Sequence, residues 1–554
     1  MKKTKRLLAT IMAFFALFSF TACGKKVEQT PTDKPSILVE FYLAGLGSEY
    51  MEKIRDAFNE RAKAGEYDFY VRVMGDENIG ISLDQALRSG SENAFLPDAV
   101  IVNSYTPRAS AALGQDHFAD LKSVYESEVT VGGQTKMLKD ALDPEMVQKV
   151  EYNGGYYSVP IMGGVMGFVY NKNLFEKYGL EPPKTMAEME DILDTIETID
   201  VNTDTTSFGD LNRNNDHYAI VYPSGAIGYW DAVTYTFAAQ YLGKEGFFDF
   251  LEVNFADENN LEESVESMRG VYDNIFKNQQ KFNNVDHKFA LSTATTQTNA
   301  LLKFSQGTSF MTPCGDWAYS ELSTIDKEFA ADIGMFSVPL ACDDNGLVNV
   351  PATPSSEVFE GVDKTDAAAV AAAEEGYTKI ERAKVSPSVI PEEDQNAEYI
   401  YFRKVSYSMA GEVDFVIPKN AKNVDKAMQF LNYFFSSEAQ NLYTKYTTVL
   451  PSGIEFDLDQ QIYDELPQFS KDCAELVRVS DIVFTGKYNT KARMYNLRSE
   501  LSGLPGDWRL GILKSNDVSY ATGLTDHILN TIKYVTPTLD AQIVAYEEAQ
   551  RAQG

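Results

Sequence analysis

The chain has 554 residues, 44% of them hydrophobic, and a formal net charge of −32 at pH 7. This is ample material for a core, and the length favours at least two domains. A charge of this sign repels phosphate backbones, so nucleic acid is not expected as a partner. Besides Cys23, the cysteines are Cys314, Cys342 and Cys473, and their spacing matches neither a zinc site nor a disulfide framework.

Residues 1–22 have the organisation of a secretory signal. Four basic residues within 2–6 precede an apolar stretch over 7–20, which is shorter than the roughly 20 residues that a spanning helix needs. The TAC sequence that ends at Cys23 resembles the lipobox of bacterial lipoproteins, although Phe20 replaces the usual leucine. Cleavage before Cys23 and lipidation of its thiol would anchor the chain. The alternative is ordinary secretion with Cys23 incidental.

Cleavage would remove four basic residues and change the net charge from −32 to −36. Residues 23–35 are polar and contain two prolines, a composition that predicts a flexible tether.

The mature chain opens with alternating strand and helix patterns. SILVEFYLAG over 36–45 is rich in strand formers, and in the helix predicted over 49–64 Met51, Ile54, Phe58 and Ala62 share one face. YDFYVRVMG, a helix over 82–90 and PDAVIVNS follow. This order predicts a parallel sheet in an α/β domain. Ligands of such sheets bind beyond the C-terminal ends of the strands.

A second α/β lobe is predicted from residue 165. The strand VMGFVY leads into YNKNLFEKYGLEPPKTMAE, where we expect Asn173 to cap a short helix and Gly179 to end it in a left-handed conformation. Thr185 and Glu188 form a capping box for the next helix.

The third part of the chain mixes apolar runs with irregular sequence. IGMFSVPL precedes an irregular section over 341–403, which reads as a surface insertion containing the helix DAAAVAAAEEG. In the segment FLNYFFSSEAQNLY, Ser437 and Gln440 are predicted to form a further capping box.

Five segments, in order, resemble family 1 extracellular solute-binding proteins, the binding subunits of ABC importers that include maltose-binding protein. They are PDAVIVNS, FADLKSVY, the central YNGGYYSVPIMGGVMGFVYNKNLFEKYGLEPPKT, FSQGTSFMTPCGDWAYSEL and FLNYFFSSEAQNLYTKYTTVLPS. Met186 replaces the family's usual tryptophan. The central segment matches the family pattern at Gly154, Tyr157, Pro160, Tyr170, Asn171, Lys172, Phe175, Gly179, Pro182, Pro183, Lys184 and Thr185.

The resemblance implies an α/β, two-lobed periplasmic-binding-protein-like fold (type II, Venus-flytrap) with a hinge between the lobes. It assigns residues 36–154 and 332–452 to lobe 1, with the insertion at 341–403, and residues 155–331 and 453–554 to lobe 2. It also implies a monomeric, lipid-anchored protein on the extracellular or periplasmic side of a bacterial membrane. Such a protein captures a solute by hinge closure and passes it unaltered to the permease subunits of an ABC transporter.

The resemblance and the chemistry of sugars together suggest ligand-binding residues. A sugar has an apolar face that stacks on aromatic rings and hydroxyls that bond to polar groups. Trp317 matches the Trp of the family's Gly-x-Trp, and Asp316 precedes it. Each candidate has a core or surface role as its alternative. The other candidates are Trp230, Trp508, Tyr42, Asn103, Tyr105 and Tyr407.

GDLNRNND places Asp210, Asn212, Asn214 and Asp216 at alternate positions, as in a calcium loop, but the glycine and glutamate of an EF-hand are missing. An Asx-rich turn is the alternative, and we expect no other cofactor.

Two rival functions stay open. The histidines (His117, His217, His287, His527) are scattered and no catalytic motif is present, yet a secreted glycosidase needs only two carboxylates. A sensor that binds solute without transport is a second rival. Among ligands we expect an oligosaccharide, since no Arg/Lys cluster awaits an anion, with glycerol phosphate or a polyamine as alternatives.

Overall fold

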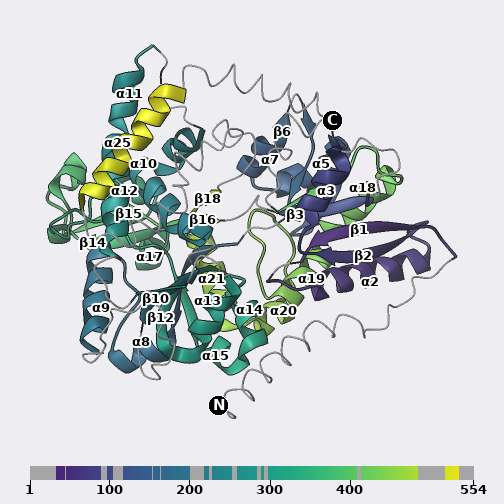
Figure 1. Ribbon diagram of the computed structural model, residues 1–554, viewed down its shortest axis with the longest axis horizontal. Helices are drawn as coiled ribbons and strands as arrows, with labels where there is room; N and C mark the ends of the chain where they lie inside the picture. The colour runs from purple at the N-terminus through teal and green to yellow at the C-terminus, as the bar shows by residue number, and fades with distance from the viewer. Residues whose placement is uncertain are drawn as a thin grey trace, which may run out of the picture.

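The protein consists of two lobes, each built on its own β-sheet (Figure 1). The computed structural model describes residues 33–535, apart from 44, 89–95, 104–116, 153, 162–163, 200–217, 224–226, 253–256, 258, 283–287, 292–296, 409–412 and 485–517.

The sheet of the first lobe has the order β2-β1-β3-β17-β8. Its first three strands, β1 (Ser36–Tyr42), β2 (Tyr70–Asp76) and β3 (Ala99–Asn103), are parallel, as predicted. Two strands from later in the chain complete it. β17 (Val413–Val416) runs antiparallel to β3 and to β8 (Val159–Pro160).

Helix α2 (Glu49–Ala64) covers one face of this sheet with the four side chains that the sequence predicted, all of them 0% exposed. Phe58 lies at the centre of an aromatic group that also includes Phe69 and Phe430. The other elements of this lobe are α3 (Ile79–Arg88), α5 (Lys122–Tyr125), β4 (Glu128–Val131), β5 (Gln134–Met137), α6 (Leu138–Ala141), α7 (Pro144–Val150), β6 (Glu151–Tyr152), β7 (Gly155–Tyr156), α18 (Val424–Phe434), α19 (Ser437–Thr447) and α20 (Gln460–Glu465).

The second lobe is organised around β9 (Met166–Asn171), which is buried along most of its length. β12 (Ser309–Gly315) pairs with one edge of β9, and β13 (Ile333–Phe336) and β16 (Val405–Ser408) pair with the other, all antiparallel. β10 (Tyr218–Pro223) and β11 (Lys288–Leu291) extend the sheet beyond β12, and β18 (Asp481–Phe484) extends it beyond β16.

Helices surround this second sheet, and the C-terminal helix α25 (Val518–Val535) packs on α11 and α12 (Figure 1). The helices are α8 (Lys172–Tyr178), α9 (Met186–Ile199), η2 (Ile227–Trp230), α10 (Asp231–Glu252), α11 (Leu261–Ser267), α12 (Arg269–Lys281), α13 (Gln297–Lys303), η3 (Phe304–Thr308), α14 (Ala318–Ile325), α15 (Lys327–Ala331) and α21 (Gln468–Val479).

The lobe boundaries that the two sheets define differ from the predicted lobe boundaries. β13 and β16 belong to the second sheet, so much of 332–452 is not in lobe 1, whereas β8 belongs to the first sheet although 155–331 was assigned to lobe 2. The reason is that β9 is completed by β13 and β16 along its second edge. The resemblance gives the order of segments but not the sheet that each strand joins.

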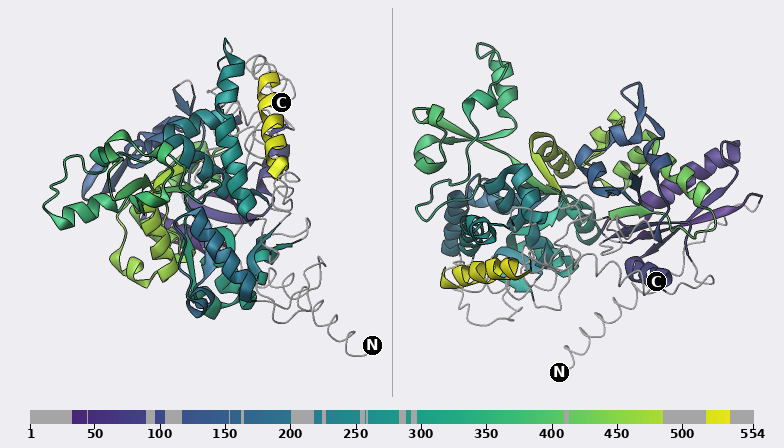
Figure 2. Two further views of the ribbon diagram at one scale, coloured as in Figure 1. Left: turned by 90° about the vertical axis from the view of Figure 1, so that its left-hand side faces the viewer. Right: turned by 90° about the horizontal axis from the view of Figure 1, so that it is seen from above.

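The insertion over 341–403 therefore extends from the second lobe (Figure 2). Its centre is the antiparallel pair of β14 (Tyr377–Glu381) and β15 (Tyr399–Arg403). The predicted alanine-rich helix is α17 (Ala367–Glu374), which has no buried residue. The remaining elements are α16 (Ser355–Val358) and the short helices η4 (Arg382–Lys384), η5 (Pro387–Val389) and η6 (Glu392–Asp394).

Two of the predicted helix ends are confirmed. Gly179 closes α8 in the left-handed conformation, with φ 67°. Thr185 and Glu188 form the capping box, because the Glu188 N–H donates to Thr185 Oγ1 at 3.2 Å and the Thr185 N–H donates to Glu188 Oε2 at 3.3 Å.

Two predicted caps are wrong by one or two residues. Asn171, not Asn173, caps α8 by accepting from the Leu174 N–H, whereas the Asn173 amide donates to Asp332. Ser436, not Ser437, caps α19. In both cases an earlier polar residue already has the extended backbone that an N-cap requires.

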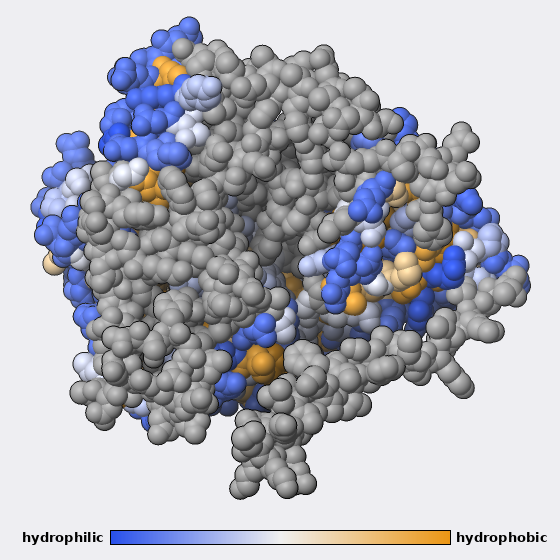
Figure 3. All heavy atoms as spheres, viewed as in Figure 1, coloured by the Kyte–Doolittle hydropathy of each residue, from blue (hydrophilic) through white to orange (hydrophobic). Residues whose placement is uncertain are grey.

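No helix in the described part of the chain has the length and apolar content to cross a bilayer. On the face shown in Figure 3, hydrophilic residues dominate the coloured surface and hydrophobic ones form small separate groups.

Candidate functional site at the lobe boundary

The indole ring of Trp317 occupies space that is free only because residue 315, two positions earlier, is a glycine. β12 ends at Gly315 and α14 begins directly after Trp317. The indole lies over the α-carbon of Gly315, so a β-carbon at position 315 would collide with the ring. The Gly-x-Trp spacing therefore has a steric cause. The Trp317 side chain is 9% exposed, and it lies where the second lobe faces the first.

Tyr229 packs beside Trp317, and Tyr42 of the first lobe is near enough to Tyr229 to affect its pKa. Tyr229, on η2 of the second lobe, has its ring centroid 6.4 Å from that of Trp317, with the planes at 64°. Burial raises the pKa of Tyr229 well above its ordinary value, and the nearby Cys314, Glu321 and Tyr42 add to the shift, while a hydrogen bond with Trp317 opposes it. Tyr42 ends β1 of the first lobe, so this cluster spans the lobe boundary.

Glu321 crosses the same boundary. It lies in the first turn of α14, and its side chain reaches the backbone of Gly45 in the turn after β1 of the first lobe. A β-carbon at Gly45 would lie 2.6 Å from Glu321 Cδ. Desolvation raises the pKa of the Glu321 carboxyl to about 7. The carboxyl group therefore completes an enclosed surface of mixed aromatic and polar character.

Asp316 faces a different space from its neighbour Trp317. Its carboxyl lies against Gly164 and accepts from the Val165 N–H at 3.4 Å, where the chain passes from β8 to β9. Burial raises the pKa of Asp316 to about 7, against the opposing effect of the Val165, Asp316 and Trp317 backbone groups. This position suits a structural role at the base of the hinge.

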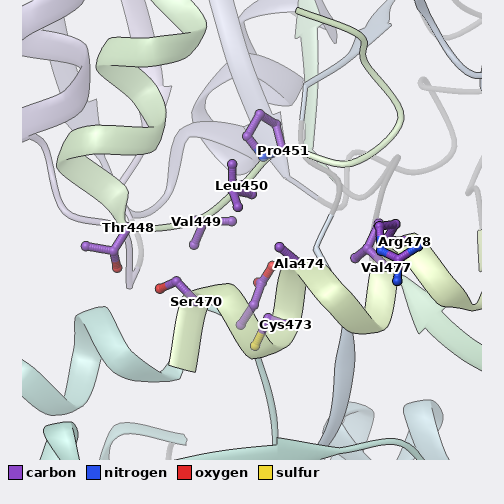
Figure 4. A pocket seen from close by; sticks show the side chains of 10 residues that line it. Thr448, Val449, Leu450, Pro451, Ser470, Cys473, Ala474, Val477 and Arg478 are labelled. Atoms are coloured by element: carbon purple, nitrogen blue, oxygen red, sulfur yellow. The ribbon is translucent and has the colours of Figure 1, made fainter. Parts of the chain in front are cut away.

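A cavity of about 220 Å³ adjoins Asp316. It lies between the segment Thr448–Pro451, which follows α19, and helix α21 of the second lobe (Figure 4). Ser470 and Ala474 lie on the side of α21 that faces this segment, and the Ser470 hydroxyl has no hydrogen-bond partner among the residues that the structure describes. The cavity therefore separates parts of the two lobes beside the hinge.

Two predicted ligand residues lie in the core of the second lobe. Trp230 is 2% exposed, and its ring makes edge contacts with Phe168, Tyr222 and Phe282 at centroid distances of 5.3–6.1 Å. Tyr407, on β16, is also 2% exposed and stacks on Tyr235 at 5.6 Å. These positions favour the packing role that the sequence left open.

The remaining candidates cannot be placed. Asn103 ends β3, where only its backbone is described. Tyr105, Trp508, Cys23 and the proposed calcium ligands Asp210, Asn212, Asn214 and Asp216 lie outside the described residues. Within the described ranges, no group of three or more His, Cys, Asp or Glu side chains is placed to hold a metal ion.

The sequence reasoning did not select Tyr229 or Glu321. Tyr229 directly precedes Trp230, and Trp230 was chosen as the candidate ligand residue because it is the larger aromatic. Adjacent side chains on a helical turn point in different directions, so the two residues face different surroundings. Glu321 follows Trp317 by four residues, a spacing that places two side chains on one face of a helix. The four-residue spacing from Trp317 is therefore the sequence feature that could have identified Glu321 as a neighbour of the indole.

The chain belongs to the bacterial extracellular solute-binding protein family, whose model matches residues 53–469. No curated protein sequence matches it.

Solved structures share the two-lobed fold at low sequence identity, in agreement with the predicted fold class. RafE of Streptococcus pneumoniae in complex with raffinose has a TM-score of 0.54 and 15% identity, over 89% of this chain and 99% of that one. The GacH receptor of Streptomyces glaucescens has a TM-score of 0.53 and 13% identity, over 89% and 96%. MalE from Bdellovibrio bacteriovorus bound to maltotriose has a TM-score of 0.50 and 15% identity, over 90% and 99%.

The raised pKa of Asp316 gives a prediction about stability. Because the folded state favours the protonated carboxyl, its contribution is complete below the unfolded pKa of about 4 and is lost as the pH rises through about 7. Asp316→Asn should remove this dependence, which amounts to at most about 4 kcal/mol. Urea unfolding between pH 4 and 8 should show the wild type losing stability relative to the variant. The exposed control Asp344→Asn should follow the wild-type profile, and parallel profiles for wild type and Asp316→Asn would contradict the assignment.

Proposed function

We propose that this protein captures a carbohydrate, in the first place an oligosaccharide, and delivers it unaltered to the permease of an ABC importer. The observation that carries the proposal is the cluster at the lobe boundary, where Tyr229 packs against Trp317 in the second lobe and the Glu321 side chain of the same lobe reaches Gly45 of the first. A ligand between the lobes would contact groups of both lobes.

The chemistry of this cluster suits a sugar. Aromatic rings stack on the apolar face of a sugar ring, and a carboxyl group such as that of Glu321 accepts from hydroxyls. Solved relatives with the same fold are described in complex with raffinose, with acarbose and with maltotriose. An anionic ligand such as glycerol phosphate is disfavoured because the described groups that affect the pKa of Tyr229 include the carboxyl group of Glu321 and no Arg or Lys.

Closure of the lobes would couple binding to delivery. The chain passes from one lobe to the other between β8 and β9, between β16 and β17, and between α20 and α21, and short connections of this kind allow one lobe to rotate against the other. A ligand drives such a rotation only to the extent that it binds the closed form better than the open one. Contacts made by both lobes at once supply that difference in affinity.

The rival functions make different demands on the site. A glycosidase needs two carboxyl groups on either side of one glycosidic bond. Asp316 and Glu321 both have a raised pKa, but Asp316 adjoins the hinge cavity whereas Glu321 faces Gly45. This arrangement favours binding without hydrolysis. A sensor would bind its solute at the same site as an importer subunit. An assay of solute uptake in cells that lack the protein distinguishes the two functions.

We also propose that Cys23 carries a diacylglycerol that anchors the protein to the outer face of the cell membrane. The support is the sequence of residues 1–23, a basic start and an apolar stretch followed by TAC. The polar stretch over 24–35 would then connect the anchor to β1.

Trp317→Ala tests the proposed site. Because the variant loses a stacking surface, we expect at least a tenfold weaker affinity for the best ligand of an oligosaccharide panel, measured by isothermal titration calorimetry. Tyr534→Ala, which removes an 84% exposed ring on α25, should bind as the wild type does. A hydrolysis assay on the same samples should show the ligand intact. Failure of the wild type to bind any carbohydrate, or cleavage of the ligand, would contradict the proposed function.

Cys23→Ala tests the anchor. Without the thiol, lipid cannot be attached, so the protein should move from the membrane fraction to the medium or periplasm, and labelling with a radioactive fatty acid should be lost. Cys473→Ala is the matched control, because its thiol is buried in the folded lobe. Fatty-acid labelling that persists in Cys23→Ala would contradict the proposed anchor.

A further inference from the structure

The side chain of Glu321 extends from the second lobe to the first and carries its carboxyl group across the lobe boundary. Its backbone belongs to α14 of the second lobe, and its N–H donates to Trp317 O at 3.2 Å. Its side chain ends on the α-carbon of Gly45, in the turn that follows β1 of the first lobe. The position is therefore sensitive to the angle between the lobes.

One oxygen of this carboxyl group is left without a partner. Oε2 is enclosed and has no hydrogen-bond partner among the described residues. Desolvation is the cause of the raised pKa of Glu321, with no contribution from a neighbouring cation. An enclosed acceptor without a donor costs free energy, and a protein retains such a group more readily where a ligand supplies the missing donor.

The surroundings indicate what kind of donor this is. The Glu321 carboxyl group is near enough to Tyr229 to raise its pKa, and the Tyr229 ring packs against Trp317, so aromatic surface lies close to the carboxyl group. A ligand that combines an apolar face with hydroxyl donors on its edge would satisfy both features at once, which describes a sugar ring.

We propose that Glu321 is a specificity-determining residue that joins the ligand to lobe closure. Its Oε2 accepts a hydrogen bond from a sugar hydroxyl, while the rest of its carboxyl group packs on Gly45 and completes the closed form. In the observed conformation of Glu321, a β-carbon at position 45 would occupy the space of the carboxyl group. This inference rests on the proposed carbohydrate function, but it names a residue and an interlobe contact that the function alone does not require.

The first arm of the test concerns the hydrogen bond. Glu321→Met keeps the length of the side chain but replaces the carboxyl group with a thioether, which is at most a weak acceptor. We expect at least a tenfold loss of affinity for the best oligosaccharide of the panel in calorimetry at pH 8, where the wild-type carboxyl is largely ionised. Wild-type affinity in Glu321→Met would overturn the proposed hydrogen bond.

The second arm is a double-mutant cycle across the lobe boundary. Gly45→Ala should weaken binding at least tenfold in the wild-type background, because the added methyl group meets the Glu321 carboxyl when the lobes close. In a Glu321→Ala background the methyl group has room, so Gly45→Ala should cost at most about twofold. Additive effects of the two substitutions would overturn the interlobe contact.

Control measurements separate this inference from the function on which it rests. Circular dichroism and thermal unfolding of each variant check that the lobes are folded. If the wild type binds carbohydrate and Trp317→Ala loses binding while both arms fail, the inference falls and the proposed function stands. If the wild type binds no carbohydrate, the proposed function and the inference fall together.

Discussion

Each lobe is built from segments that are not contiguous in the sequence, and the rest of the structure depends on that constraint. The first sheet takes β1, β2 and β3 from the N-terminal part of the chain but is completed by β8 and β17. The second sheet is completed by β16 and β18, which lie on either side of β17 in the sequence. The lobes are therefore joined by several short connections. They cannot separate, but they can rotate about those connections, and the space between them is where a ligand can be enclosed.

The residues at this boundary divide into two environments. Trp317 and Tyr229 pack together in the second lobe, and Glu321 extends from there to Gly45 of the first lobe. Asp316, although next to Trp317 in sequence, adjoins the cavity near α21. The turn after β12 therefore places two consecutive side chains in different surroundings, Trp317 beside Tyr229 and Asp316 beside the cavity near α21.

Most of the fold could be predicted from the sequence, because its signals are local. The apolar face of α2, the left-handed Gly179 and the capping box at Thr185 each depend on residues a few positions apart, and each is confirmed. The sheet to which IGMFSVPL belongs depends on pairing with β9, more than 160 residues earlier. No local pattern specifies such a pairing, so the lobe boundaries were misplaced.

The site was less predictable for a similar reason. Trp317 could be chosen as a candidate because the Gly-x-Trp pattern is local, and the steric basis of that pattern at Gly315 is local as well. Trp230 and Tyr407 were chosen for their residue type, but the packing of distant strands and helices decides that they lie in the core. The contact of Glu321 with Gly45 joins residues 276 positions apart, so the sequence gives no sign of it.

The central claim is that the lobes move when the ligand binds, and an interlobe distance tests it most directly. Spin labels at Glu60→Cys on α2 and Glu328→Cys on α15 would lie on exposed positions of different lobes, while the native Cys314, Cys342 and Cys473 are buried. Pulsed electron paramagnetic resonance of the soluble protein without residues 1–23 should then show the distance distribution shift and narrow when the tightest-binding oligosaccharide saturates the site. An unchanged distribution at saturation would contradict closure of the lobes around the ligand.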